Sequence, residues 1–226
     1  MNRSSAKQQL DLLKIEVPSW AYGNSGTRFK VFAQAGVPRN PFEKVSDAAV
    51  VARLTGGVGS VALHIPWDKV DDYAKLAAFA DDEGVTIGTI NSNTFQDEDY
   101  KFGALTHHDE RIRRKAIDLT KRAVDEAREA GGRMLTIWPG QDGYDFPGQV
   151  NYEQIWRYTI DGIREICAAH PDVQFAIEYK PKEPRVRMTL ANAPKTLLAI
   201  EETGVDNLGI VMDFGHSLMA GESPTE

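Results

Sequence analysis

Residues Val173–Glu178 read VQFAIE and residues Leu208–Asp213 read LGIVMD, so two short apolar runs each end in a carboxylate. Runs of this length, rich in β-branched and aliphatic residues, are typical of strands buried on both faces of a parallel sheet. Two buried carboxylates at neighbouring strand ends would lose hydration and repel each other, so we expect a compensating cation. A divalent metal would supply that charge.

Two further polar residues follow these runs closely. His216 lies three residues after Asp213 and could hold the same ion or a second ion beside it, and Lys180 lies two residues after Glu178. Acidic residues at strand ends are also common as helix caps and as partners of lysine, so each cluster alone has a purely structural alternative. The two clusters together favour a metal site.

Length and composition limit the class of protein. The 226 residues are 42% hydrophobic and 26% charged, which predicts a globular chain with a sizeable core, and we expect one domain over residues 1–226. The net charge of −7 argues against a nucleic-acid partner, which normally requires a basic face.

The single cysteine and the absence of long apolar segments bear on the cellular compartment. Because Cys167 is the single cysteine of the chain, no disulfide framework can form within it, and a reducing compartment is expected. Cys167 lies on the apolar side of an expected helix, which predicts that it packs in the core. No stretch approaches the roughly 20 apolar residues of a membrane helix, and the first residues lack the apolar segment of a signal peptide. We therefore expect no membrane partner and a cytoplasmic location.

Strand-like runs alternate with amphipathic stretches along the whole chain, which implies a parallel α/β sheet. Gly84, Gly131 and Gly204 follow expected helix ends, where a left-handed cap is favoured. The expected strands are 15–20, 60–65, 85–91, 133–138, 173–178 and 208–213, and the expected helices are 43–54, 70–83, 109–130, 152–169 and 191–203.

About six β/α units can be counted, and the last is cut short. A closed (β/α)8 TIM barrel has eight units and typically about 250 residues, so we expect an incomplete barrel, with an open doubly wound sheet as the alternative. The loop at about 22–41 is rich in Gly, Asn, Ser and Pro. We expect this loop to be a lid over the strand-end site, although Phe29–Ala33 could instead form an edge strand.

Two other strand ends carry rings. His64 lies at the end of the second expected strand and Trp67 just beyond it, and Trp138 ends the fourth. A lone histidine after a strand is more often a hydrogen-bonded core residue, but an adjacent indole provides a flat wall suited to a sugar. This recurrence favours a polyhydroxylated substrate.

Five segments of the sequence stand out together: PSWAYGNSGTRF at Pro18–Phe29, HIPWD at His64–Asp68, FPGQ at Phe146–Gln149, EYKPKEPR at Glu178–Arg185 and MDFGH at Met212–His216. Together they resemble the bacterial L-rhamnose isomerases of the xylose-isomerase-like TIM barrel superfamily. The resemblance runs from about Leu10 to the last residue, and its most specific part is EYKPKEPR.

The resemblance implies roles for individual residues. Glu178 and Asp213 would bind a first divalent ion and His216 a second, Lys180 would reach the sugar oxygen at the reacting carbonyl, and His64 would hydrogen-bond the substrate. The substrate would also contact Trp67, Trp138 and Phe29.

The resemblance also implies an activity and an assembly. The reaction would be the interconversion of L-rhamnose and L-rhamnulose, with Mn²⁺ as the usual ion and Co²⁺, Mg²⁺ or Zn²⁺ as substitutes. The enzyme would be a homotetramer with two metal sites per complete barrel and no organic cofactor.

In that family the remaining ligands come from the seventh and eighth strands. We therefore expect this chain to be the amino-terminal portion of such an enzyme and to be inactive in isolation. The alternatives are a non-catalytic sugar-binding fragment and another metal-dependent barrel enzyme, such as a sugar epimerase or an endonuclease-like enzyme. An endonuclease or a sugar-phosphate enzyme would need a basic groove or phosphate clamp, for which only Arg185 and Arg187 provide a hint.

Overall fold

The computed structural model describes residues 3–23, 32–183 and 185–223. The chain forms two compact units: the first comprises Met1–Thr89 and Glu129–Gly132, and the second Ile90–Arg128 and Arg133–Glu226. The expectation of a single domain stays a prediction.

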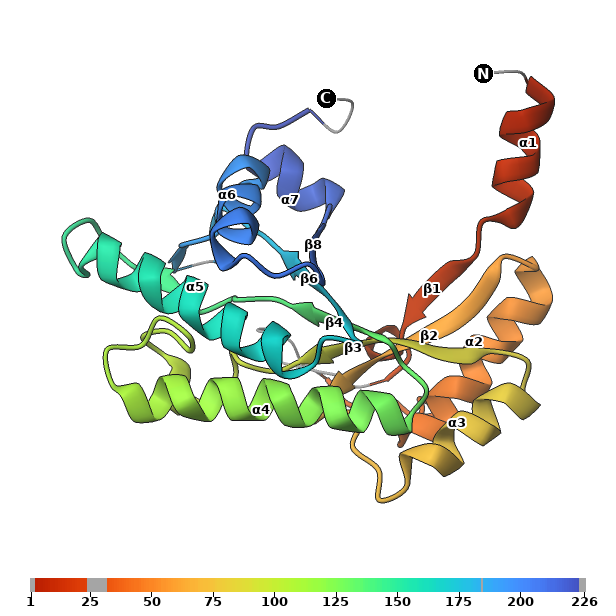
Figure 1. Ribbon diagram of the computed structural model, residues 1–226. Helices are drawn as coiled ribbons and strands as arrows, with labels where there is room; N and C mark the ends of the chain where they lie inside the picture. The colour runs from red at the N-terminus through yellow and green to blue at the C-terminus, as the bar shows by residue number, and fades with distance from the viewer. Residues whose placement is uncertain (1–2, 24–31, 184, 224–226) are drawn as a thin grey trace. The chain divides into compact units, whose positions relative to one another are not determined.

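The first unit contains parallel strands covered by a helix pair. Strand β1 (Ile15–Pro18) pairs in parallel with β2 (Val58–Ile65), and β3 (Thr86–Ser92) begins in this unit and ends in the second. Helices α2 (Pro41–Thr55) and α3 (Tyr73–Asp82) pack side by side (Figure 1). Helix α1 (Arg3–Leu12) precedes β1, and the 3-10 helix η1 (Ser19–Ala21) follows it.

Local sequence explains the bounds of α2. Asn40 caps its start by accepting a hydrogen bond from the Glu43 amide, a contact worth about 1 kcal/mol, and Pro41 occupies the first turn, where no amide donor is needed. Gly56 ends the helix in the left-handed conformation, at φ 68°.

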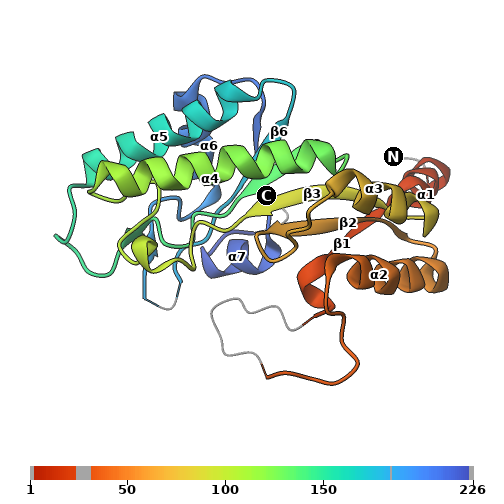
Figure 2. The same cartoon turned by 90° about the horizontal axis from the view of Figure 1, so that it is seen from below.

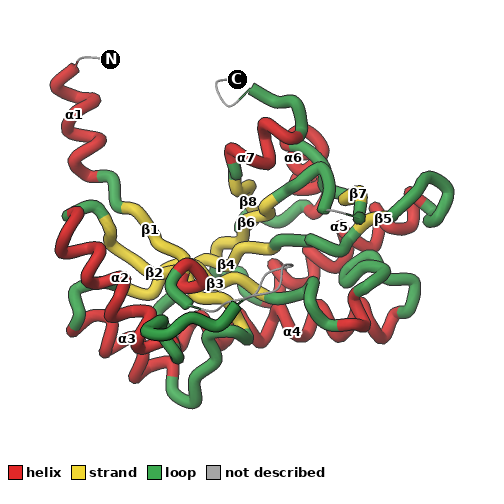
Figure 3. Tube along the Cα trace, turned by 180° about the vertical axis from the view of Figure 1, so that it is seen from behind, coloured by secondary structure: helices red, strands yellow, loops and turns green. Residues whose placement is uncertain are grey.

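The second unit contains strands β4 (Met134–Ile137), β6 (Gln174–Glu178) and β8 (Leu208–Val211), which pair in parallel in that order. The strand order of the sheet is β1-β2-β3-β4-β6-β8. Short strands β5 (Gly143–Tyr144) and β7 (Arg187–Met188) pair antiparallel with each other as a separate ladder, seen beside α5 in Figure 3. Because β6 and β8 are parallel neighbours, Glu178 and the residues after Val211 leave the sheet at the same edge.

Helices pack around these strands in the second unit. They are η2 (Glu98–Tyr100), α4 (Glu110–Glu129), α5 (Tyr152–Ala169), α6 (Ala193–Thr203) and α7 (Phe214–Met219), and α4, α5 and α6 lie close to one another in Figure 2. Asn151 and Asn192 cap α5 and α6 in the same way as Asn40 caps α2. The core of this unit includes the fully buried Leu135, Phe175 and Ile177.

The six predicted strands and five predicted helices are confirmed, with ends that differ by a few residues. Helices α1 and α7 were not predicted. Cys167 is buried, as expected of a core residue. Phe29 lies outside the described residues, so its predicted role and that of the loop as a lid stay predictions. No helix of the described chain is both long enough and apolar enough to span a membrane.

Candidate metal centre

Glu178, Asp213 and His216 lie together in the second unit. Glu178 is the last residue of β6, Asp213 caps the start of α7, and His216 lies in the first turns of that helix. One potential ligand atom from each residue lies within 4.8 Å of the other two. The His216 Nδ1 atom is 3.5 Å from Glu178 Oε1 and 3.8 Å from Asp213 Oδ2.

Asp213 serves two purposes in this arrangement. Its Oδ1 accepts a hydrogen bond from the His216 amide at 2.8 Å, which fixes the start of α7. The predicted alternative of a helix cap is therefore correct, but the cap uses Oδ1 and leaves Oδ2 directed at the imidazole.

Burial makes this cluster electrostatically unfavourable in the absence of a cation. Burial, and then the neighbouring charge of Asp213, raise the pKa of Glu178 to about 7, although Lys180 opposes the shift. Burial also lowers the pKa of His216, which favours the neutral imidazole that a metal requires. The His216 Nδ1 atom is buried and has no hydrogen-bond partner among the described residues.

These observations fit a divalent cation. Ligands that share an ion at about 2.1 Å lie at most about 4.2 Å apart, and the measured imidazole-to-carboxylate separations fall within this range. Two carboxylates and one imidazole suit Mn²⁺, Zn²⁺ or Co²⁺.

A hydrogen-bond network holds α7 beside β6. The Tyr179 hydroxyl lies 2.7 Å from Ser217 Oγ and donates to Glu222 Oε2. Glu222 also accepts from Ser217 Oγ and from the Ala193 amide at the start of α6. Tyr179, which follows Glu178, thus ties the helix that carries His216 to the end of β6.

Lys180 lies buried beside this cluster. Its Nζ donates to Glu183 Oε1, and both side chains are almost fully buried. The same ammonium lies 5.9 Å from the centre of the Trp138 ring, which packs edge-on against Phe95. The Trp138 Nε1 atom is buried without a hydrogen-bond partner in the described part of the chain. The Trp138 ring and the Lys180 ammonium, which is fixed by its hydrogen bond to Glu183, therefore lie near each other.

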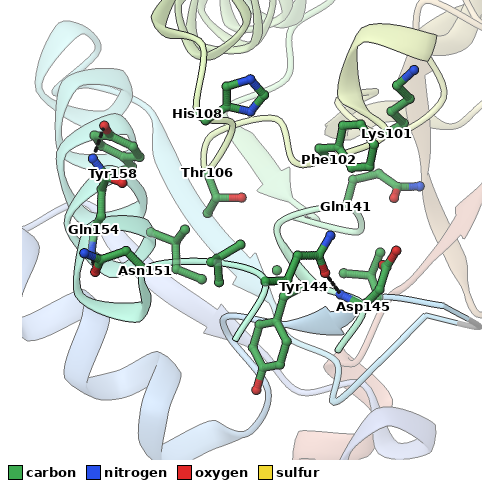
Figure 4. A pocket seen from close by; sticks show the side chains of 15 residues that line it. Lys101, Phe102, Thr106, His108, Gln141, Tyr144, Asp145, Asn151, Gln154 and Tyr158 are labelled. Atoms are coloured by element: carbon green, nitrogen blue, oxygen red, sulfur yellow. Dashed lines mark hydrogen bonds between the residues drawn. The ribbon is translucent and has the colours of Figure 1, made fainter. Parts of the chain in front are cut away.

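The loops of the second unit also form a hollow of about 330 Å³. Figure 4 shows polar side chains around it, among them Thr106 and Gln141 from loops and Gln154 from α5. None of Glu178, Asp213 and His216 lines this hollow, so it is distinct from the cluster.

The strand end in the first unit carries a separate ring cluster. The His64 ring stacks on the Trp67 ring with ring centres 3.7 Å apart, and Trp20 packs edge-on against the His64 ring. Burial, assisted by the charge of Lys44, lowers the pKa of His64 to about 3, so its imidazole is neutral near pH 7. Asp68 accepts from the His64 amide and from Lys44 Nζ at this strand end.

The structure thus brings together Glu178, Asp213 and His216, and it places Lys180 near Trp138, all in the second unit. It also brings together His64 and Trp67 in the first unit. The substrate contacts predicted for His64, Trp67 and Trp138 stay predictions. The sequence analysis assigned no role to Tyr179 and did not predict the pairing of Lys180 with Glu183. The close succession of acidic and basic residues in Glu178–Arg185 was a signal for such a pair.

A family model described as "Xylose isomerase-like TIM barrel" matches residues 51–226. A probable sugar isomerase of Rhizobium meliloti (strain 1021) is 36% identical over 218 residues, which cover 94% of this chain and 50% of that protein. This chain therefore spans about half the length of that curated relative.

Two solved structures share the fold. D-psicose 3-epimerase from Clostridium cellulolyticum H10, solved with D-tagatose, has a TM-score of 0.68 at 15% identity and covers 93% of this chain and 67% of its own. The IOLI protein, solved with a zinc atom, has a TM-score of 0.64 at 14% identity over 93% of this chain and 66% of its own. The predicted xylose-isomerase-like fold class is confirmed.

The finer family expectation is wrong. The matching proteins are named as a probable sugar isomerase and an epimerase, and none supports a bacterial L-rhamnose isomerase or its amino-terminal portion. The motif EYKPKEPR at Glu178–Arg185 was taken as specific to that family, and the proteins that match do not support this.

Proposed function

This chain belongs to the xylose isomerase-like TIM barrel family, and on that premise we propose that it binds a divalent cation through Glu178, Asp213 and His216 and acts on a sugar as an aldose–ketose isomerase. The observation that carries the proposal is the convergence of three ligand atoms within 4.8 Å from two elements of the second unit. The name of the relative from Rhizobium meliloti supports the sugar class.

The cation would act as a Lewis acid on the oxygens at C1 and C2 of the sugar. The three side chains would hold it, and the neutral state of the His216 imidazole suits that task. Of the candidate ions, we propose Mn²⁺, because two of the three ligands are carboxylates, the ligand type that suits Mn²⁺.

Lys180 would bind the sugar at the reacting carbonyl. Its Nζ has three protons, and Glu183 accepts one of them, so others can be donated to a sugar oxygen. The hydrogen bond to Glu183 restricts the ammonium before the substrate arrives, which reduces the entropy lost on binding. Trp138 would cover the apolar face of the sugar ring and exclude water.

The test is a substrate screen with the metal-stripped protein reloaded with Mn²⁺. Ketose formation from one or more aldoses is the expected result, and it would also refute the expectation that the isolated chain is inactive. Activity should be lost in Glu178→Gln and retained in Asp206→Asn, because Asp206 is an exposed residue on the α6–β8 connection. If the protein converts one ketose into another and forms no aldose, the proposed isomerase activity is wrong and the activity is that of an epimerase. The predicted homotetramer can be checked on the same sample by sedimentation.

A further inference from the structure

A second hollow, of about 750 Å³, lies in the second unit. Its lining residues come from the β5–β7 ladder and the helices α6 and α7, among other segments. It shares Tyr144 and Asp145, both labelled in Figure 4, with the first hollow. Its lining residues are Tyr144, Asp145, Pro181, Lys182, Arg185, Arg187, Met188, Ala191, Lys195 and Met219.

The lining of this hollow is strongly cationic. It contains Lys182, Arg185, Arg187 and Lys195 but only one carboxylate, Asp145, in a chain whose net charge is −7. Like charges gathered around one space repel one another, so the arrangement favours an anion between them.

The one carboxylate is already committed. Arg185 Nη1 donates to Asp145 Oδ2, and Arg185 Nη2 donates to the Lys101 carbonyl at 2.8 Å. These bonds tie the segment of Arg185 to the segments of Asp145 and Lys101. Lys182, Arg187 and Lys195 form no ion pair with a carboxylate anywhere in the described ranges. Glu222 follows α7, and its carboxylate reaches the start of α6. It accepts hydrogen bonds from the Ala193 amide, Tyr179 and Ser217, and it forms no ion pair with these three cationic residues.

Lys195 adds a partly desolvated charge. It lies in the first turn of α6, its Nζ is 5.7 Å from the centre of the Trp156 ring, and burial lowers its pKa. An ammonium in that position gains from an anionic partner more than a fully hydrated one does.

We propose that this hollow is a binding site for the phosphate group of a small phosphorylated ligand, held by Lys182, Arg187 and Lys195. A phosphate carries about −1.5 to −2 charges at neutral pH and offers three acceptor oxygens, which matches three cationic donors. Arg187 can bind two of these oxygens at once. The site is separate from the candidate metal centre, because Glu178, Asp213 and His216 do not line it.

The test is isothermal titration calorimetry on metal-stripped protein in the presence of EDTA, so that metal-bound phosphate does not contribute. Inorganic phosphate and glucose 6-phosphate are titrated separately, with glucose as the neutral probe. We expect saturable binding of the phosphorylated probes that weakens as ionic strength rises, and no binding of glucose. Tighter binding of the ester than of phosphate indicates a sugar phosphate as the ligand, and equal affinities indicate phosphate itself.

The variants Arg187→Gln and Lys195→Gln should each raise the Kd about tenfold or more, because each removes a charged hydrogen bond. Lys75→Gln is the matched control, since Lys75 is an exposed lysine on α3, and it should leave the Kd unchanged. The proposal is overturned if neither probe binds saturably at about 10 mM, or if Lys75→Gln weakens binding as much as the other two variants. Thermal melting of each variant confirms that the fold is retained.

Discussion

Glu178 Oε1 lies 3.5 Å from His216 Nδ1, although one residue ends β6 and the other belongs to α7. The distance exceeds that of a good hydrogen bond, and His216 Nδ1 has no hydrogen-bond partner in the described chain. Two partly buried polar groups at this separation that do not bond each other leave a space suited to an ion that both can contact. The proposed function depends on this relationship.

Lys180 is expected to be needed for turnover and not for metal binding. Replacing it alone would leave the buried Glu183 carboxylate without its charge partner, a loss of about 3–5 kcal/mol in stability. The double variant Lys180→Gln/Glu183→Gln avoids this charge, and we expect its kcat to fall by at least about 100-fold with Mn²⁺ affinity retained.

The comparison for that variant is Glu183→Gln alone, whose amide oxygen can still accept from the Lys180 ammonium. It also leaves a buried charge without its partner and lowers stability, so both variants are assayed at a temperature at which they stay folded, and Glu183→Gln should lose much less activity. Steady-state ketose formation measures both. Equal rates for the double and single variants would show that Lys180 does not touch the substrate.

Tyr179→Phe is expected to loosen α7 and so displace His216. The change removes the hydroxyl that bonds Ser217 and Glu222, which should cost about 1–3 kcal/mol in the free energy of unfolding. We also expect Mn²⁺ affinity to fall severalfold, because the helix that carries one ligand is less restrained.

Tyr152→Phe is the control for this effect, since among the described residues the Tyr152 hydroxyl bonds only the Gly148 amide, at an exposed position. Urea unfolding and Mn²⁺ titration of the two variants supply the comparison. Unchanged metal affinity in Tyr179→Phe would limit that residue to a structural role.

Asp142 should make the stability of the protein depend on pH. It is fully buried, and burial raises its pKa from the ordinary value to about 6, although hydrogen bonds from Thr106 and Ala104 oppose the shift. Between about pH 4 and 6 the folded state binds more protons at this carboxyl than the unfolded state does. Its contribution to stability therefore falls as the pH rises through that window, by about 3 kcal/mol in total.

Asp142→Asn tests this expectation with little change in shape. The asparagine oxygen can still accept from the Ala104 and Thr106 amides, and the Oδ2 atom that it replaces has no hydrogen-bond partner among the described residues. Urea unfolding at pH 4 and pH 7 should show a smaller loss of stability for this variant than for the parent protein. Asp206→Asn should retain the parental slope, and a parental slope in Asp142→Asn would refute the assignment.

Much of the fold could be predicted from the sequence because its signals are local. The apolar runs ending at Glu178 and Asp213 defined two strand ends, and glycines such as Gly204 marked helix ends with the left-handed conformation that they adopt. Parallel pairing then places both strand ends at one edge, which was enough to predict the three candidate ligands.

The rest depended on contacts that no local pattern encodes. The Tyr179 network joins residues up to 43 positions apart, and the cationic hollow is assembled from β5, β7, α6 and α7. Helix α7 was missed because Phe214–Met219 is only six residues long and is stabilised by its Asp213 cap and these tertiary bonds. The finer family resemblance was wrong because it rested on short segments of one sequence, which identified the xylose isomerase-like fold but not the group within it.

The most direct test of the proposed metal centre is the electron paramagnetic resonance signal of free Mn²⁺ during titration into the metal-stripped protein. We predict that the free-ion signal is suppressed until the protein is saturated, that Glu178→Gln and His216→Ala largely abolish this suppression, and that Asp206→Asn retains it. A free-ion signal equal to that in buffer alone, or equal suppression by Glu178→Gln and the parent protein, would contradict the account.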